Sequence, residues 1–364
     1  MSKKVLVSLI GKQTMPNLLI ELEHGPFDVH ILVATEGVKE TAEHIKTVFE
    51  VKHSEVKIKI IFVDENSIKG VKDKITEELN DFNKDNNCEI SFNFTGGTKQ
   101  MSIGMYTLAE EKFKDSPRYY SHRNNAWQNY AEEKSKRVEY TKDLSIETYL
   151  KSLGMKYKYG SENNFVKTKD ETNALFEKYK EFINDDWIKE LRDQRNTARK
   201  NKQDYSVDLN PGQISKLENW NWPFDVNNKN KLSKKEMDYI TGGWLEEWTY
   251  NNLPFDGDKK HSVKVYSGPD NNTENEFDVM CMRENKLYVL ECKTAFDKNL
   301  AINTSYKSSA LIKKFGIEAE SVVVYLPCGN SAEKNLKSRC DTEGIKPCTP
   351  DDIINGKWIK TYKE

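Results

Sequence analysis

Short apolar runs alternate with helix-like segments over the first 130 residues, and this alternation constrains the fold more than any other feature of the sequence. Runs typical of buried strands cover residues 5–10, 29–34, 56–63 and 89–94. Segments with a helical pattern cover residues 17–23, 37–49 and 68–83. Strands that alternate with helices form parallel sheets with helices on both faces. The sequence therefore predicts a doubly wound, Rossmann-like α/β domain, with an antiparallel hairpin at residues 118–130 on the edge of the sheet.

The loops that follow the strands are where such a sheet binds ligands, because the carboxyl ends of parallel strands share one edge. Three of these loops are polar and suit phosphate or ribose groups. The residues that we expect to line a ligand site there are Gln13, Thr14, Thr35, Thr95, Gly96, Gly97, Thr98 and Lys99. No G-x-G-x-x-G follows the first strand, which argues against a redox dinucleotide, and no Walker lysine motif is present.

The loop at residues 95–99 is the strongest of these signals. Gly96 and Gly97 let the backbone approach an anion closely, and the helix that follows presents its N-terminal amides. Thr98 and Lys99 add a hydroxyl group and a positive charge. From these residues alone, a tight strand-to-helix turn with a capping threonine is an equally good interpretation.

A second pattern lies near the other end of the chain. Residues 277–282 and 287–293 are β-favouring, with a turn-like segment between them, so they predict a hairpin. Glu291 and Lys293 then leave the same face of one strand, and pairing across the hairpin brings Asp278 beside them. An acid at the end of a buried strand is unusual unless it is paired or binds a metal. The alternative is a solvated strand face with an ordinary ion pair.

A helix upstream supplies a further acid. Trp244, Leu245 and Trp248 form one apolar face over residues 242–250, and Glu246 and Glu247 flank that face. Either glutamate can complete a metal site with the hairpin acids. For Glu247 we favour the simpler interpretation of an exposed helix glutamate.

These residues resemble the PD-(D/E)XK nuclease superfamily. Its pattern maps onto Glu246, Asp278, Glu291 and Lys293, and Phe277 stands where the motif has proline. The resemblance implies that Asp278 and Glu291 hold Mg²⁺ or Mn²⁺, that the Cys292 carbonyl and Glu246 complete the metal site, and that Lys293 positions or deprotonates the attacking water.

The segment at residues 93–101 resembles the CRISPR-associated Rossmann-fold (CARF) sensor domains. The two resemblances together imply a homodimeric nuclease of type III CRISPR defence that cleaves DNA, RNA or both. They also imply that it is activated by cyclic tetra-adenylate, bound at the loop residues named above. Two alternatives remain: a restriction or repair endonuclease without nucleotide activation, and a ligand-binding regulatory protein with a vestigial nuclease fold.

Composition sets further bounds. The net charge of −2 gives no overall basic field, so a nucleic-acid site must be a local patch. The six cysteines show no C-x-x-C spacing and suggest reduced thiols. The apolar run near the start fits a strand better than a signal peptide, and no stretch approaches membrane-spanning length. We therefore expect a cytoplasmic protein that has no membrane partner.

We expect a sensor domain at residues 1–131, a mainly helical linker region at 132–236 and a nuclease domain with an α/β restriction-endonuclease-like fold at 237–364. A basic cluster in the linker region is a hypothetical phosphate contact, but we favour a solvated helix face. Its members are Lys189, Arg192, Arg195, Arg199, Lys200 and Lys202.

The aromatic segment 220–224 is expected to pack against the core. A helix over 306–316 would carry Lys307, with a strand to follow at 321–327.

Overall fold

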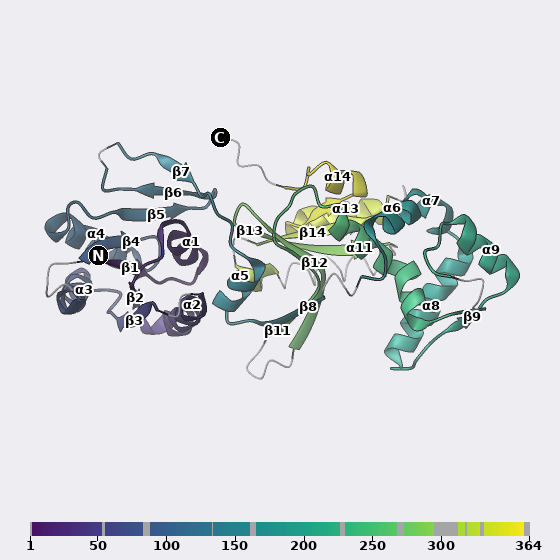
Figure 1. The fold of residues 1–364 in the computed structure, drawn as a ribbon, viewed down its shortest axis with the longest axis horizontal. Helices are drawn as coiled ribbons and strands as arrows, with labels where there is room; N and C mark the ends of the chain where they lie inside the picture. The colour runs from purple at the N-terminus through teal and green to yellow at the C-terminus, as the bar shows by residue number, and fades with distance from the viewer. Residues whose placement is uncertain are drawn as a thin grey trace.

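The computed structural model describes residues 2–52, 55–82, 88–132, 134–160, 165–225, 230–267, 273–294, 312–316, 319–327 and 331–359. Two sheets lie side by side along the long axis of the molecule (Figure 1). The N-terminal α/β unit forms one end, a group of helices forms the other, and the second sheet lies between them. In the described segments no helix combines the length and the apolar character that crossing a bilayer requires.

The first sheet has the strand order β3-β2-β1-β4-β5-β6-β7. Its strands are β1 (Lys3–Leu9), β2 (Val29–Ala34), β3 (Lys57–Phe62), β4 (Cys88–Asn93), β5 (Arg118–His122), β6 (Ala126–Asn129) and β7 (Arg137–Glu139). The strands β1 to β5 are parallel to one another, and β6 and β7 are antiparallel to their neighbours. The predicted doubly wound fold with an antiparallel edge hairpin is confirmed.

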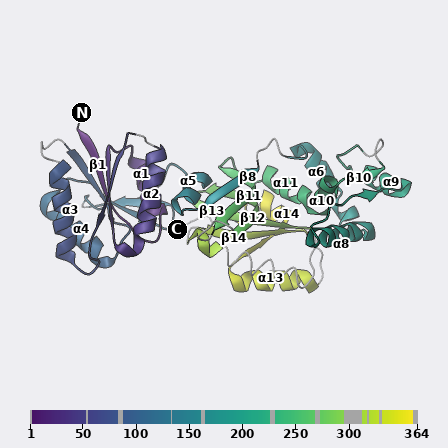
Figure 2. The same ribbon diagram turned by 90° about the horizontal axis from the view of Figure 1, so that it is seen from below.

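Helices cover both faces of this sheet, with α1 (Met15–His24) and α2 (Lys39–Lys52) on one face and α3 (Ile68–Phe82) and α4 (Lys99–Lys112) on the other (Figure 2). A short 3₁₀ turn, η1 (Glu36–Val38), precedes α2. Alternate β1 residues serve the two layers, because Leu6 packs with the α1 and α2 side and Val5 with the α3 and α4 side. Burial on both faces explains why the central strands β1 and β2 are mostly apolar.

The second sheet has the order β15-β14-β13-β12-β11-β8. Its strands are β8 (Lys156–Gly160), β11 (Lys259–Ser267), β12 (Thr273–Arg283), β13 (Lys286–Lys293), β14 (Ala319–Tyr325) and β15 (Lys346–Cys348). The predicted β12–β13 hairpin is present, and its turn residues Glu284 and Asn285 have φ values of 49° and 56°. Two successive left-handed residues are the geometry of a tight two-residue hairpin turn.

Both faces of the second sheet are also covered. Helices α11 (Trp244–Asn251) and α14 (Pro350–Ile354) pack on one face, and α13 (Ser331–Glu343) packs on the other (Figure 2). Trp244 and Trp248 are buried against this sheet, as the apolar face of their helix predicted. A π-helical turn, η3 (Tyr239–Gly243), precedes α11. The only described part of the predicted helix at 306–316 is the 3₁₀ turn η4 (Lys313–Phe315) with its flanking residues, and Lys307 lies outside the described residues.

Residues 132–236 contribute to both sheets, since β7 joins the first and β8 joins the second. The helices of this region are α5 (Ile146–Ser152), α6 (Lys169–Glu177), α7 (Tyr179–Phe182), α8 (Asp186–Lys200), α9 (Pro211–Asn219) and α10 (Lys234–Asp238). Two short strands, β9 (Val207–Asp208) and β10 (Lys231–Leu232), pair with each other. The division of the chain at 131 and 236 stays a prediction.

The helices α6 to α10 share a core with the second sheet. Leu175, Phe182 and Leu191 pack in the same cluster as Trp244 and Trp248. Trp220 and Trp222 are also buried there, so the expectation that the aromatic segment packs rather than stacks on bases is confirmed. The described cysteines, which exclude Cys328, are free thiols.

Candidate functional sites

The first candidate site lies where β12 and β13 separate. The two strands pair from Arg283↔Lys286 to Val279↔Leu290, and there the ladder ends. Beyond that point β12 continues beside β11, and β13 continues beside β14. Asp278 and Glu291 are the first residues past the last pair. The two acids therefore lie at the fork, the point where the two strands diverge.

The structure brings three predicted residues together in this fork. The Lys293 Nζ atom lies 3.1 Å from the Glu291 Oε2 atom and 3.7 Å from the Asp278 Oδ2 atom. The Cys292 backbone N–H donates a hydrogen bond of 2.6 Å to the same Asp278 oxygen. Both carboxylates thus face one ammonium group.

The strand opposite Asp278 is irregular. His261 pairs with Val279 and Val263 pairs with Phe277, so Asp278 lies across from Ser262, which has a φ of 49°. His261 packs against aromatic rings on the α11 side, whereas Val263 joins the core on the other side. The side chains therefore change faces around Ser262. Such irregularities commonly redirect side chains beside functional sites.

Glu246 on α11 belongs to the same group of charges. It is half-buried, and its pKa is raised to about 8, first by burial and then by the Asp278 carboxylate. Lys293 opposes this rise, and Glu276 and Glu291 add to it. Several carboxylates are thus close enough to disfavour one another's ionisation, which is the condition that a divalent cation relieves.

Glu247 has a different role from the one predicted. We expected an exposed helix glutamate, but it is 8 % exposed, and its carboxylate accepts hydrogen bonds from the backbone N–H groups of Val166 and Lys167. The segment before α6 covers it. This contact joins residues about 80 positions apart, so helix periodicity alone could not reveal it. Glu247 fixes that segment to α11.

The donor set suits a hard cation. Carboxylate oxygens are the ligands that Mg²⁺ and Mn²⁺ prefer. Within the described residues, no three Asp, Glu, His or Cys side chains are already arranged to hold a metal ion. The Cys292 thiol donates a hydrogen bond to the Thr249 hydroxyl, and burial raises its pKa well above the ordinary value. The thiol is therefore a poor candidate ligand, and the prediction for Cys292 concerns its backbone carbonyl.

The second candidate site is a cavity of about 280 Å³ at the carboxyl edge of the first sheet. Gln13, Thr95, Gly96 and Gly97 line it, as the sequence predicted. Gly96 is required by close packing, because a Cβ atom there would lie 2.2 Å from the Leu9 carbonyl oxygen. The glycines therefore serve the tight turn and also bring the backbone to the cavity wall.

The other four predicted residues lie outside this cavity. Thr14 is buried, and its hydroxyl is 2.8 Å from that of Ser152. Thr35 is buried where β2 passes into η1. The Thr98 hydroxyl accepts a hydrogen bond from the Met101 N–H and caps α4, and Lys99 is exposed in the first turn of that helix.

Several residues that the sequence interpretation did not assign also line the cavity. They are Gly11, Lys12, Met15, Pro16, Leu19, Tyr120, Ser121, His122, Arg123, Asn125, Glu284 and Asn285. The β5–β6 hairpin was predicted, and the polar residues of its turn were the signal that could have identified His122 to Asn125. Glu284 and Asn285 carried no such signal, because they belong to the second sheet.

The tip of the β12–β13 hairpin thus forms part of the wall of this cavity. The Asn285 side chain accepts a hydrogen bond of 2.8 Å from the Leu144 N–H and donates one of 2.8 Å to Asn125. It is 3 % exposed. One hairpin therefore connects the two candidate sites, with Asn285 at its tip and Asp278 and Glu291 at its far end.

Family models match two parts of the chain. The model of the Card1 CARF domain matches residues 5–149, and the model of the Card1-like endonuclease domain matches residues 233–360. The chain joins a CARF domain of the Card1 type to a Card1-like endonuclease domain. The first candidate site lies in the endonuclease domain, and the cavity is built from the CARF domain and the tip of the endonuclease hairpin. A comparison with curated proteins gives no match.

Solved structures share this fold over 98 % of the chain. Protein VC1899 from Vibrio cholerae is 18 % identical, with a TM-score of 0.76 over 96 % of that chain. Can2 from Sulfobacillus thermosulfidooxidans, solved in complex with cyclic tetra-adenylate, is 20 % identical, with a TM-score of 0.73 over 100 % of that chain. A type III CRISPR defence DNA nuclease activated by cyclic oligoadenylate is 14 % identical, with a TM-score of 0.61 over 51 % of that chain.

Proposed function

We propose that this protein is a metal-dependent nuclease of the PD-(D/E)XK type, activated by cyclic tetra-adenylate in type III CRISPR antiviral defence. The substrate is DNA, RNA or both. The observation that carries the proposal is the group formed by Asp278, Glu291 and Lys293 at the fork of two strands in an endonuclease domain.

Asp278, Glu291, Glu246 and the Cys292 carbonyl would hold Mn²⁺ or Mg²⁺. A bound cation of this kind supplies positive charge to the phosphate and lowers the pKa of a bound water. Asp278 is already oriented by its hydrogen bond from the Cys292 N–H. Glu246 approaches from α11, on a different element, so the donors surround the fork from two sides.

Lys293 would position the attacking water and offset charge that develops on the phosphate. Burial alone would lower the pKa of Lys293, but the carboxylates of Asp278 and Glu291 raise it above the ordinary value. Lys293 is therefore an ammonium group at neutral pH in the metal-free protein. This protonation state favours a positioning and electrostatic role over proton abstraction.

The cavity of the CARF domain would hold part of the messenger. At about 280 Å³ it is smaller than the pockets that hold drug-sized ligands, whereas a cyclic tetranucleotide is larger than such ligands. The ligand is also two-fold symmetric, so two copies of the chain can each contact half of it across a shared axis. We therefore propose a homodimer with one messenger per two chains. The complex of Can2 with cyclic tetra-adenylate supports this choice of ligand.

The β12–β13 hairpin would carry the signal. A ligand in the cavity contacts its tip at Glu284 and Asn285, and the strands of the hairpin lead directly to Asp278 and Glu291. A ligand shifts an equilibrium only as far as it prefers one state. Activation thus requires that the messenger bind better to the hairpin position that aligns the acids.

Cleavage assays test this function directly. The purified protein is incubated with Mn²⁺, labelled DNA and RNA, and a panel of cyclic oligoadenylates. We expect cleavage that depends on both Mn²⁺ and cyclic tetra-adenylate, and calorimetry should detect binding of that messenger. Cleavage at the full rate without any nucleotide would instead support a restriction or repair endonuclease. Absence of cleavage under all conditions would refute the proposal.

A further inference from the structure

A second cavity, of about 580 Å³, opens beside Glu246. It lies between α8, α10, η3 and β11, and both Glu246 and Ser262 belong to its wall. Four cationic side chains also line it, namely Arg195, Arg199, Lys234 and Lys235. The proposed catalytic group is therefore bordered by a basic hollow that no part of the nuclease motif accounts for.

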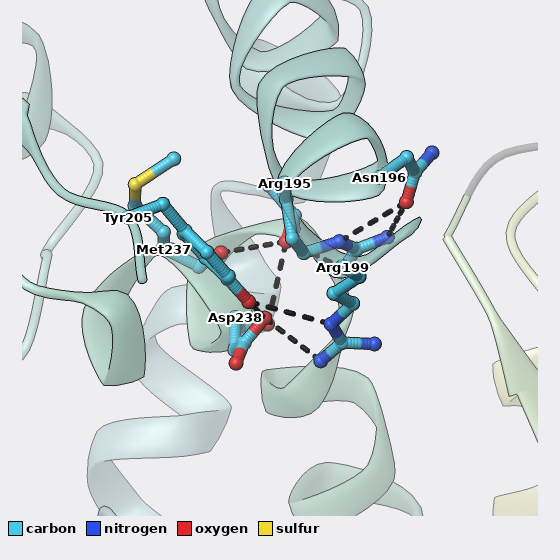
Figure 3. A network of polar contacts seen from close by, with 7 residues as sticks. Arg195, Asn196, Arg199, Tyr205, Met237 and Asp238 are labelled. Carbon is cyan, nitrogen blue, oxygen red and sulfur yellow. Dashed lines mark hydrogen bonds and ion pairs between the residues drawn. The ribbon is translucent and has the colours of Figure 1, made fainter. Parts of the chain in front are cut away.

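Most of the acids in this wall are already satisfied. Asp238 forms an ion pair of 2.8 Å with Arg199 and accepts a hydrogen bond of 2.6 Å from the Tyr205 hydroxyl (Figure 3). Glu247 is bound by two backbone N–H groups. Arg199 is thus neutralised by a direct ion pair. Arg195 and Lys235 also feel carboxylates of this wall, but among the described residues neither they nor Lys234 form an ion pair.

Arg195 is the most constrained of these three. Its Nη1 group donates a hydrogen bond of 2.6 Å to the Thr241 hydroxyl, and its Nη2 group donates one of 3.2 Å to the Asn196 side chain. Both partners are neutral, and across the described segments no carboxylate forms an ion pair with Arg195. The carboxylates of Asp238 and Glu246 act on Arg195 from beyond ion-pair distance. Its guanidinium therefore has no directly bound anion, and phosphate is the anion that its planar donors fit best.

A short chain of contacts ties Arg195 to the catalytic strand. The Thr294 hydroxyl donates a hydrogen bond of 2.8 Å to the Thr241 carbonyl oxygen, and Thr294 directly follows Lys293. Arg195 therefore has a fixed position relative to the fork. A phosphate bound to it would lie in the cavity whose wall also contains Glu246.

We infer that Arg195, assisted by Lys234 and Lys235, binds a backbone phosphate of the nucleic-acid strand beside the scissile one. This inference rests on the proposed nuclease function. It changes the interpretation of the basic cluster seen in the sequence, because the structure separates its members. Lys189 is exposed and pairs with Asp186, as a solvated helix face predicts, whereas Arg195 faces the cavity.

The test compares Arg195→Gln with Lys189→Gln, a matched control on the same helix. Both are placed in an Asp278→Asn background, so that substrate binds without being cut. Affinities for single-stranded DNA and RNA of equal length are measured with saturating cyclic tetra-adenylate over a range of salt concentrations. Arg195→Gln should weaken binding several-fold and lower the slope of log affinity against log salt by about 0.7, the loss of one phosphate contact. Lys189→Gln should leave both unchanged.

Arg195→Lys keeps the charge and serves as the rescue variant, with thermal unfolding as the check on folding. It should restore most of the salt slope. A slope for Arg195→Gln equal to that of the control, while the wild-type protein still cuts in a messenger-dependent way, would overturn this inference alone. A wild-type protein that neither binds nor cuts nucleic acid would overturn the proposed function as well.

Discussion

At the scale of single residues, the unusual state of Glu246 is the feature with the clearest consequence. Its pKa of about 8 in the fold stands well above the ordinary 4.5, because of burial and then the Asp278 carboxylate. A carboxyl group whose pKa is raised by folding stabilises the fold fully below its unfolded pKa. That contribution is lost as the pH rises through the folded pKa.

Glu246→Gln should therefore raise the melting temperature of the metal-free protein, relative to wild type, by several degrees at pH 8 and by little at pH 4.5. The difference between the two proteins should grow between these pH values. Mn²⁺ should stabilise the wild type at pH 8 more than the variant. Thermal unfolding at both pH values, with EDTA or Mn²⁺, checks this. Equal melting temperatures at pH 8 would show that folding does not raise the pKa of Glu246.

The acids of the fork could be predicted from the sequence because their spacing follows from strand geometry. Glu291 and Lys293 are two residues apart on one strand, and a short turn fixes the register of Asp278. The burial of Glu247 could not be predicted in this way. It depends on a segment that is distant in sequence and covers α11. Local sequence patterns determine which way a side chain points, whereas packing between distant segments determines whether it is buried.

At the scale of elements, the β12–β13 hairpin links the two domains. The sequence predicted its turn, but it did not predict that the turn contacts the CARF domain. The hydrogen bonds of Asn285 reach Asn125 and Leu144, which are more than 140 positions away. For the same reason the pairing of β8 with β11 could not be read from the polar composition of residues 132–236.

Asn285→Gly should uncouple messenger binding from cleavage. Glycine retains the left-handed turn and removes the amide that joins the hairpin to the CARF domain. The rate at saturating cyclic tetra-adenylate should fall by about fivefold or more, the scale of a typical coupling energy. Cleavage assays measure the rate, and calorimetry on the same preparation measures the affinity for cyclic tetra-adenylate.

Asn221→Gly is the matched control, since Asn221 has a φ of 56° and contacts neither candidate site. It should activate like wild type. A normal saturated rate for Asn285→Gly would mean that the hairpin tip does not transmit the signal.

At the scale of the whole molecule, the account requires two chains. The proposed messenger is two-fold symmetric, and the CARF cavity of about 280 Å³ would hold part of it. Light scattering should give a mass of twice 42.3 kDa, and calorimetry should give one cyclic tetra-adenylate per two chains. A stoichiometry of one messenger per chain would contradict the shared site.

The central claim is that Asp278, Glu291 and Lys293 cut phosphodiesters around one cation. The most direct measurement is cleavage by Asp278→Asn with Mn²⁺ and saturating cyclic tetra-adenylate, alongside its affinity for the messenger. The account predicts that the rate falls at least about 100-fold, while messenger affinity stays close to that of the wild type. Cleavage at the wild-type rate by this variant would contradict it.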